Sequence, residues 1–468
     1  MEIEITRELC VSDYNDDANK AKEKLSEVSE TFCLAKWLQT SLHLTTGHTN
    51  SCYHPPPHKM DLNRQNLNET PEKDEQKQMM LNGQRPSGCS YCWKMEDQGN
   101  LSDRHYRSGE PWAMENFDKV VAGGVVNPTY VEVNFNSACN LKCSYCSPQY
   151  SSSWMAETKQ HGAWPTIKPH NDPTHFAGDR RPIPQREHNP YVEKFWKDWP
   201  AMYPNLRHFR MTGGEPLMDP NTYKVFDYVL ENPKPDLHLN VTSNFSVEPK
   251  IFDKYMDYTK RICDGENVEH FMQFVSLDGL GPQAEYMRNG LDFNRLWDNV
   301  NRFLNDIPGR NSVTFIITLN NLSITSLRDL FTAIYSLREI YSDDYQRVWF
   351  DVPVLTDPKW QSIQILPESY SFMMEKVVKY IEGSPEESCE GFAGFKDYEV
   401  AKLQRDLDHM RTELPEAELN RARVNFYRFF TEHDKRRGTN FLETFPEMID
   451  FWDDCMYRSN KYDSSPLF

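Results

Sequence analysis

The sequence lacks any apolar stretch near the roughly 18 residues that a membrane-spanning helix needs. It also lacks a run of Lys or Arg long enough to follow a phosphate backbone, and its net charge of -18 repels nucleic acid. The first residues, MEIEITREL, are charged and have no apolar signal-peptide core. We therefore expect a cytoplasmic protein that binds neither membrane nor nucleic acid, with Arg180 and Arg181 as a local basic patch.

Cysteine is scarce in the later part of the chain. Eight of the eleven cysteines lie in the first 146 residues. Cysteines of a reducing cytosol are metal ligands or free thiols more often than disulfides. Cys263, Cys389 and Cys455 stand alone without ligand spacing, so we expect them to be buried as small apolar side chains.

From about residue 130 onward, strand-like and helix-like stretches alternate. Six runs rich in β-branched and aromatic residues predict strands at 129–135, 207–213, 237–243, 271–279, 312–320 and 347–355. Apolar residues at helical spacing predict helices over 219–232 and 292–306. This alternation predicts an α/β fold of parallel β/α units. Six units suit a partial (β/α)6 barrel of the TIM type, and a doubly wound open sheet is the alternative.

One segment before this region and two segments within or after it have other patterns. Residues 50–90 resemble irregular chain, and residues 147–190 form an insertion too long for an ordinary connection. Residues 361–468 have a mostly helical pattern. The predicted domains are an N-terminal cysteine-rich region (1–115), a β/α core (116–360) and a helical C-terminal extension (361–468).

The stretch CNLKCSYC, directly after the first predicted strand of the core, holds Cys139, Cys143 and Cys146. Active sites of parallel β/α folds gather at the carboxyl ends of strands. Spacings of three and two residues let one loop aim three sulfurs at a common point. Soft thiolates select zinc, copper(I) or an iron–sulfur cluster. Zinc would need a fourth protein ligand nearby, whereas a cluster held by three cysteines leaves one iron open.

CNLKCSYC resembles the Cys-x3-Cys-x2-Cys signature of the radical S-adenosylmethionine (SAM) superfamily, with Tyr145 at the aromatic position before the last cysteine. The resemblance implies a 4Fe–4S cluster on Cys139, Cys143 and Cys146, whose open iron binds SAM. It further implies reductive cleavage of SAM to a 5′-deoxyadenosyl radical, which takes a hydrogen atom from the substrate. A one-electron donor such as flavodoxin or ferredoxin is implied as partner.

The ends of the next predicted strands carry motifs that are similar to the SAM-binding motifs of that superfamily. They are MTGGEP, VTSNF, SLDG and EYMRNG. The resemblance implies contacts to the methionine amino group, the ribose and the carboxylate of SAM. The implied SAM-binding residues are Tyr145, Gly213, Gly214, Glu215, Ser243, Asn244, Ser276, Asp278 and Arg288. No general acid or base is assigned.

Four more cysteines precede the core: Cys33, Cys52, Cys89 and Cys92. They make a complete four-thiolate set, which suits either structural zinc or an iron–sulfur cluster. The stretch CSYCWKMEDQGNLSDRH resembles the twitch domain, a shortened relative of the SPASM domain, and so implies an auxiliary 4Fe–4S cluster. Twitch domains commonly follow the barrel, whereas these cysteines precede it. His54 or His58 could replace one cysteine as ligand.

The resemblance implies an oxidoreductase or modifying enzyme that acts on a peptide, a protein side chain or a small polar metabolite. The second cluster would transfer electrons or bind substrate. A zinc-stabilised binding protein and a degenerate fold that binds SAM without cleaving it are the alternatives. We predict that the insertion is a lid over the substrate, through His161, Trp164, His170, His175, Arg180 and Arg181.

Overall fold

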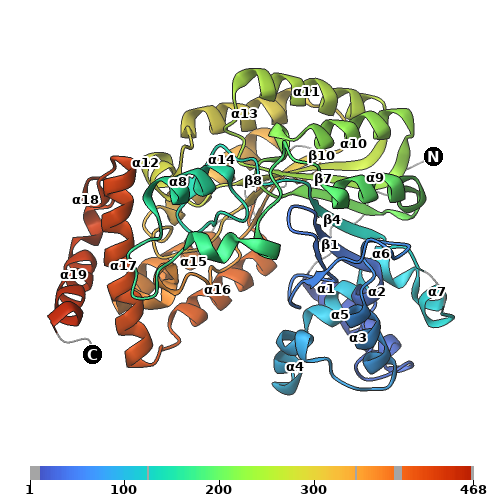
Figure 1. The fold of residues 1–468 in the computed structure, drawn as a ribbon, viewed down its shortest axis with the longest axis horizontal. Helices are drawn as coiled ribbons and strands as arrows, with labels where there is room; N and C mark the ends of the chain where they lie inside the picture. The colour runs from blue at the N-terminus through green and yellow to red at the C-terminus, as the bar shows by residue number, and fades with distance from the viewer. Residues whose placement is uncertain (1–10, 124–125, 343–344, 384–392, 465–468) are drawn as a thin grey trace.

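The fold is built on one nine-stranded sheet surrounded by helices, as the computed structural model shows (Figure 1). The structure describes residues 11–123, 126–342, 345–383 and 393–464. Cys10 and Cys389 lie outside the described residues. Within those ranges, helices that combine the length and the apolar character needed to cross a membrane are absent.

All six predicted core strands form, and they lie side by side in chain order. They are β4 (Tyr130–Asn134), β6 (His208–Thr212), β7 (Lys234–Ser243), β8 (Val268–Ser276), β10 (Asn311–Ile316) and β11 (Val348–Asp351). Each is parallel to its neighbours. Because the order never reverses, the doubly wound alternative is wrong. A mixed α/β fold is confirmed, and the curvature of a partial barrel stays a prediction.

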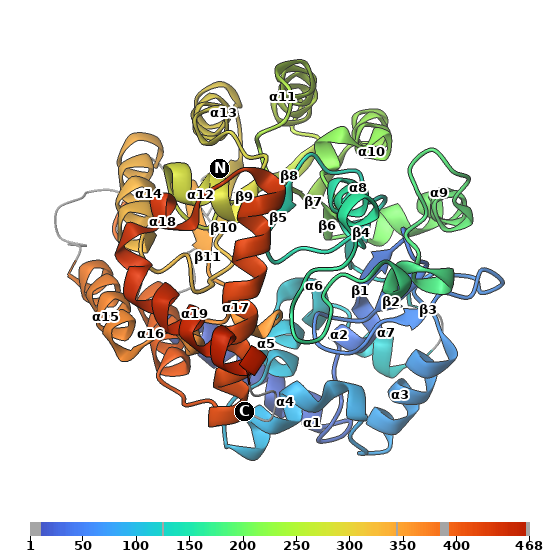
Figure 2. The ribbon, with the colours of Figure 1, turned by 60° about the vertical axis from the view of Figure 1, so that its left-hand side comes forward.

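Helices connect these strands and cover one face of the sheet (Figure 2). They are α10 (Pro220–Glu231), α11 (Pro249–Asp264), α13 (Phe293–Asp306) and α14 (Leu327–Tyr341). Asp219 and Asp292 begin α10 and α13 by accepting hydrogen bonds from the backbone N–H groups of Asn221 and Arg295, as caps do. Phe226 of α10 and Phe303 of α13 pack against Phe271 of β8. The apolar face of each helix therefore meets the sheet.

The N-terminal region adds three strands to this sheet, which sequence patterns did not indicate. They are β1 (Gln39–His43), β2 (His48–Asn50) and β3 (His58–Lys59). β1 lies parallel to β4, so that His43 stands opposite Asn134 at the carboxyl ends of both strands. β2 and β3 follow in antiparallel order. The proposed boundary near residue 115 therefore runs through a region that shares a sheet with the core.

The expectation of irregular chain over 50–90 is wrong for part of that range. The helix α3 (Pro71–Leu81) begins after Thr70, whose hydroxyl accepts a hydrogen bond from the Lys73 N–H. Pro71 occupies the first turn, where a missing N–H costs nothing. The helix α4 (Ser90–Asp97) follows. The Thr-Pro pair was the local signal for this helix, and the polar composition concealed it.

The C-terminal extension is helical, as predicted. Its longer helices are α15 (Glu368–Glu382), α16 (Asp397–Met410), α17 (Glu416–Arg437) and α19 (Ile449–Ser464). On α16, the Glu399 carboxylate pairs with Arg338 of α14 at 2.6 Å, and both groups are buried. Lys402 of the same helix contacts Asp351 at the end of β11. These contacts attach the extension to α14 and to the last strand of the sheet.

Candidate functional site

The three-cysteine loop follows β4 at the carboxyl edge of the sheet. Its short strand β5 (Lys142–Cys143) pairs with β9 (Arg288–Asn289), which comes from beyond β8. The Ser144 N–H donates to the Met287 carbonyl at 2.8 Å, and the Cys146 N–H donates to the Cys143 carbonyl at 2.9 Å. Backbone hydrogen bonds therefore fix the loop on which all three thiols stand.

A buried charged network lies against Cys143. Arg288 contacts the Cys143 sulfur at 3.7 Å and pairs with the Asp278 carboxylate at 2.8 Å. The other Asp278 oxygen accepts a hydrogen bond from the Tyr145 hydroxyl at 2.7 Å. Asp278 also accepts from the Thr318 N–H at 2.9 Å. Four predicted site residues thus meet: Cys143, Tyr145, Asp278 and Arg288.

The donor set of this loop fits an iron–sulfur cluster. Burial raises the pKa of the Cys146 thiol to about 12, so a bound cation must favour the thiolate form. The Arg288 guanidinium beside Cys143 works in that direction. Among the described residues, no three His, Cys, Asp or Glu side chains converge as ligands of a single metal ion. Each thiolate of a cluster binds its own iron, so cluster ligands need not converge on one point.

The two glycines after β6 permit a close approach of two loops. Gly213 has a φ of +127°, a conformation that favours glycine. A Cβ atom on Gly214 would lie 2.4 Å from the Ala138 carbonyl oxygen, next to Cys139. The Glu215 N–H donates to that same carbonyl at 2.7 Å. The Gly-Gly-Glu motif therefore packs directly on the cysteine loop.

Glu215 is buried and joins two strand ends. Its carboxylate accepts hydrogen bonds from the Leu217 N–H at 3.0 Å and from the Asn244 N–H at 2.8 Å. Burial raises the pKa of Glu215 to about 7. Asn244 in turn donates to the Asn140 side chain at 2.8 Å. These contacts bring the predicted residues after β6 and β7 to the cysteine loop.

Ser243 and Ser276 occupy the last positions of β7 and β8. The Ser243 hydroxyl accepts a hydrogen bond from the Phe245 N–H at 2.9 Å. Every predicted SAM-binding residue thus lies at or just beyond the carboxyl edge of the sheet. This agrees with the positions of their motifs after successive predicted strands. Direct contact of these residues with SAM stays a prediction.

The four N-terminal cysteines line one cavity, although the three strands β1 to β3 and the helix α3 lie between Cys33 and Cys92 in the chain. Cys33, Cys52, Cys89 and Cys92 share this cavity with His54, Lys36 and Arg104. Burial raises the pKa of Cys52 and of Cys92 to about 12. The cavity has the four thiol donors that a cluster or zinc would need, but these thiols do not converge as ligands of a single ion.

The two histidines considered as alternative ligands have other partners. His54 pairs with the Asp103 carboxylate at 2.7 Å and stacks on Tyr91 with ring centroids 3.9 Å apart. The His58 ring contacts the Gln76 side chain at 3.3 Å. His54 and its partner Asp103 both line the four-cysteine cavity. The isolated thiols of Cys263 and Cys455 are buried, as predicted.

Several groups that fix the three-cysteine loop come from distant parts of the chain, and no sequence signal pointed to them. The Gln361 side chain accepts from the Ser144 hydroxyl at 2.7 Å and donates to the Ser144 carbonyl at 3.0 Å. Arg437 of α17 donates to the Lys142 carbonyl at 2.8 Å. Trp154 of α8 (Ser152–His161) donates to the Cys143 carbonyl at 2.8 Å. The insertion and the C-terminal extension both support the loop.

Part of the 147–190 insertion is packed into the protein core. Trp164 is fully buried and stacks on Phe429 of α17, with ring centroids 4.3 Å apart. The His170 ring meets Trp360 edge to face at 4.8 Å. In contrast, His161, His175 and Arg180 are exposed. The role of the insertion as a lid stays a prediction, and Trp164 and His170 serve as its anchor.

These features define a mixed α/β protein with a three-cysteine loop at the carboxyl edge of a parallel sheet. No family model matches the chain. The chain is similar to two curated relatives, both named GTP 3′,8-cyclase. The one from Sulfurimonas denitrificans is 24% identical over 196 residues, 41% of this chain and 46% of the relative. The one from a Sulfurovum species is 24% identical over 157 residues, 34% of this chain and 36% of the relative.

The matched part of this chain thus spans less than half the length of either curated relative. Solved structures of SuiB from Streptococcus suis, one bound to S-adenosylmethionine and one to the precursor peptide SuiA, are 12% identical. They cover 74% and 77% of this chain and 69% and 71% of SuiB, with TM-scores of 0.33 and 0.34. The curated matches, together with the cysteine spacing, support the radical SAM superfamily as the class of this protein.

Proposed function

We propose that this protein is a radical SAM enzyme that uses Cys139, Cys143 and Cys146 to hold a 4Fe–4S cluster. The observation that carries the proposal is the buried network of Arg288, Asp278 and Tyr145 against the Cys143 sulfur. When bound, the cluster and SAM would supply a 5′-deoxyadenosyl radical that removes a hydrogen atom from the substrate. The residues of this chain would bind and orient SAM and the substrate, and would exclude water from the site.

The proposed SAM site extends from the cysteine loop along the strand ends. Arg288 is buried, and its Nε atom has no hydrogen-bond partner among the described residues. A guanidinium that keeps an unused N–H can bind a carboxylate, which suits the carboxylate of SAM. Asp278 holds the guanidinium in place through its Nη2 atom. Glu215 and Asn244 would position the backbone that faces the methionine amino group and the ribose.

We further propose that Cys33, Cys52, Cys89 and Cys92 hold an auxiliary 4Fe–4S cluster, in a region that resembles a twitch domain. Their common cavity supports this proposal. Besides the thiols, the cavity is lined by cationic Lys36, Arg104 and Arg107 and by the carboxylate Asp103, and this excess of positive groups favours a site that carries net negative charge. The substrate reaction and the electron donor, a flavodoxin or ferredoxin, rest on the resemblance alone.

The test is reconstitution without oxygen, followed by a dithionite-dependent assay for 5′-deoxyadenosine. We expect wild-type protein to contain iron and sulfide and to cleave SAM. Cys143→Ala should abolish cleavage, because the loop loses a ligand. Cys455→Ala, which removes a buried thiol outside both cysteine sites, should leave cleavage unchanged. A colourless protein that contains only zinc, or cleavage that survives in Cys143→Ala, would refute the proposal.

A further inference from the structure

A solvent-open cavity lies beside the three-cysteine loop and is lined by basic side chains. The basic residues in its wall are His43, His48, Lys168, His175 and Arg180. No Asp or Glu is among the described residues that line it. The cavity encloses about 1280 Å³, including its open mouth. A concave surface lined by one sign of charge concentrates ions of the opposite sign.

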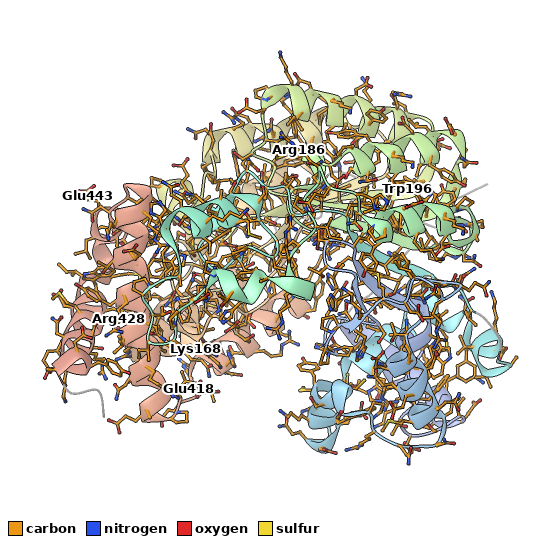
Figure 3. The ribbon with its side chains drawn as sticks, in the orientation of Figure 1. Lys168, Arg186, Trp196, Glu418, Arg428 and Glu443 are labelled. Carbon is orange, nitrogen blue, oxygen red and sulfur yellow. The ribbon has the colours of Figure 1, made fainter. Side chains whose placement is uncertain are left out.

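The charge of this cavity contrasts with the rest of the protein. The chain carries a net charge of -18, and many of its Lys and Arg side chains pair with carboxylates. Within the described part of the chain, the side chains of Lys168 and Arg180 have no ion-pair or hydrogen-bond partner. Both are exposed, and Figure 3 shows Lys168 in the insertion, on the face toward the viewer. The neighbouring Arg181 differs, because it pairs with Glu187 at 2.5 Å.

Two elements connect the cavity to the proposed reaction site. His43 ends β1 opposite Asn134, the residue that ends β4 before the cysteine loop. Gln149 and Tyr150, which also line the cavity, follow Cys146 within four residues. On the insertion, the Asn171 side chain donates to the Cys146 carbonyl at 3.4 Å. The cavity therefore opens at the same edge of the sheet as the three thiols.

The basic residues in the cavity wall indicate how much negative charge the ligand carries. One Arg or Lys is enough to bind a single carboxylate. Two permanent cations, Lys168 and Arg180, lie in one cavity wall with three histidines, and this set suits a group that carries two or more negative charges, as a phosphate or a phosphate chain does. On the same segment, the Asp172 carboxylate is engaged with the Thr174 N–H and hydroxyl at 2.8 and 2.7 Å.

We propose that this cavity binds the phosphate group or phosphate chain of the substrate, which is then a phosphorylated small molecule. That the ligand is a substrate rests on the function proposed above, whereas the presence of a phosphate-binding site does not. Lys168 and Arg180 bring the insertion to the ligand, and His43, whose ring also contacts Asn50 at 3.0 Å, lines the cavity from the sheet. The insertion is thus a wall of the substrate site, held by its buried residue Trp164.

The experiment measures binding of pyrophosphate to the full-length protein by calorimetry at low salt, with no SAM or reductant present. We expect one saturable site in the wild type. The double variant Lys168→Ala/Arg180→Ala should bind about tenfold more weakly, because two charge-assisted hydrogen bonds are lost. Arg181→Ala is the matched control, since Arg181 is exposed but absent from the cavity wall, and it should stay within about twofold.

Three outcomes would overturn the proposal. The first is no saturable binding up to about 10 mM pyrophosphate. The second is an equal loss in Arg181→Ala and in the double variant, which would show unspecific attraction. The third is hexaglutamate that binds more tightly than pyrophosphate and displaces it, which would assign the site to an acidic peptide. Because no outcome requires SAM cleavage, saturable pyrophosphate binding by a protein that fails to cleave SAM would refute the proposed function alone.

Discussion

The Asp278 carboxylate and the Arg288 guanidinium lie 2.8 Å apart, with 0% and 7% of their side chains exposed, beside the sulfur of Cys143. Asp278 belongs to the loop after β8, and Arg288 begins β9. The pair therefore fixes the loop that pairs with the cysteine segment. A buried charge without its partner is costly, so this contact can be tested through stability as well as through activity.

Asp278→Asn should lower the free energy of unfolding by about 3 kcal/mol, because it leaves the Arg288 charge buried without compensation. Urea unfolding of the purified protein measures this loss. The matched control is Asp253→Asn, which breaks an exposed ion pair with Arg302 at 2.9 Å and should cost less than about 1 kcal/mol. Equal losses in the two variants would show that the buried pair does not hold the loop.

The double variant Cys89→Ala/Cys92→Ala should lose about half of the iron after reconstitution, on the count of two clusters. The geometric reason is that both thiols line the same cavity as Cys33 and Cys52, away from the three-cysteine loop. Iron and zinc are measured together by mass spectrometry, with Cys263→Ala as control. Unchanged iron would remove the auxiliary cluster, and loss of zinc in place of iron would make this a zinc site.

Trp164→Ala should destabilise the protein by about 3 kcal/mol or more, because it removes a fully buried ring that stacks on Phe429. Thermal and urea unfolding provide the measurement. His161→Ala, at an exposed position of the same insertion, should change stability by less than about 0.5 kcal/mol. A small effect of Trp164→Ala would mean that the insertion is not anchored at this ring.

Stability should fall as the pH drops below about 6.5, in part through His270 of β8. Burial, with the nearby His238 and Arg310, lowers the pKa of His270 to about 3 in the folded protein. A row of ring side chains runs in register across four strands, through Tyr130, His208, His238 and His270. The Glu269 carboxylate lies near His238 in this row. Near pH 5 the unfolded chain holds a proton on His270 that the folded protein does not, so stability rises with pH there.

His270→Gln should therefore flatten the dependence of unfolding free energy on pH by about 1.4 kcal/mol per pH unit near pH 5. Urea unfolding at pH 4.5, 5, 6 and 7 measures the slope of unfolding free energy against pH. These values lie on both sides of about 6.5, the ordinary pKa of histidine. His188→Gln serves as control, since the His188 side chain is 76% exposed. An unchanged slope in His270→Gln would contradict the lowered pKa.

The sequence alone determined the secondary structure of the core and the main candidate ligands. Apolar spacing predicts a helix over 292–306, and the helix found there is Phe293–Asp306, with Asp292 as its cap. Cys139, Cys143 and Cys146 lie within one loop, so their proximity follows from spacing. Such features are local, because the periodicity of side chains and the reach of a short loop depend on neighbouring residues only.

Tertiary structure decided which distant groups meet. Gln361 binds Ser144 across 217 residues of chain, and His43 shares a cavity wall with Arg180. The addition of β1 to β4 brought the N-terminal region into the sheet and set His43 at the carboxyl edge of the sheet. No local pattern encodes these contacts, because they arise when the whole chain buries its apolar surface and satisfies its backbone hydrogen bonds at once.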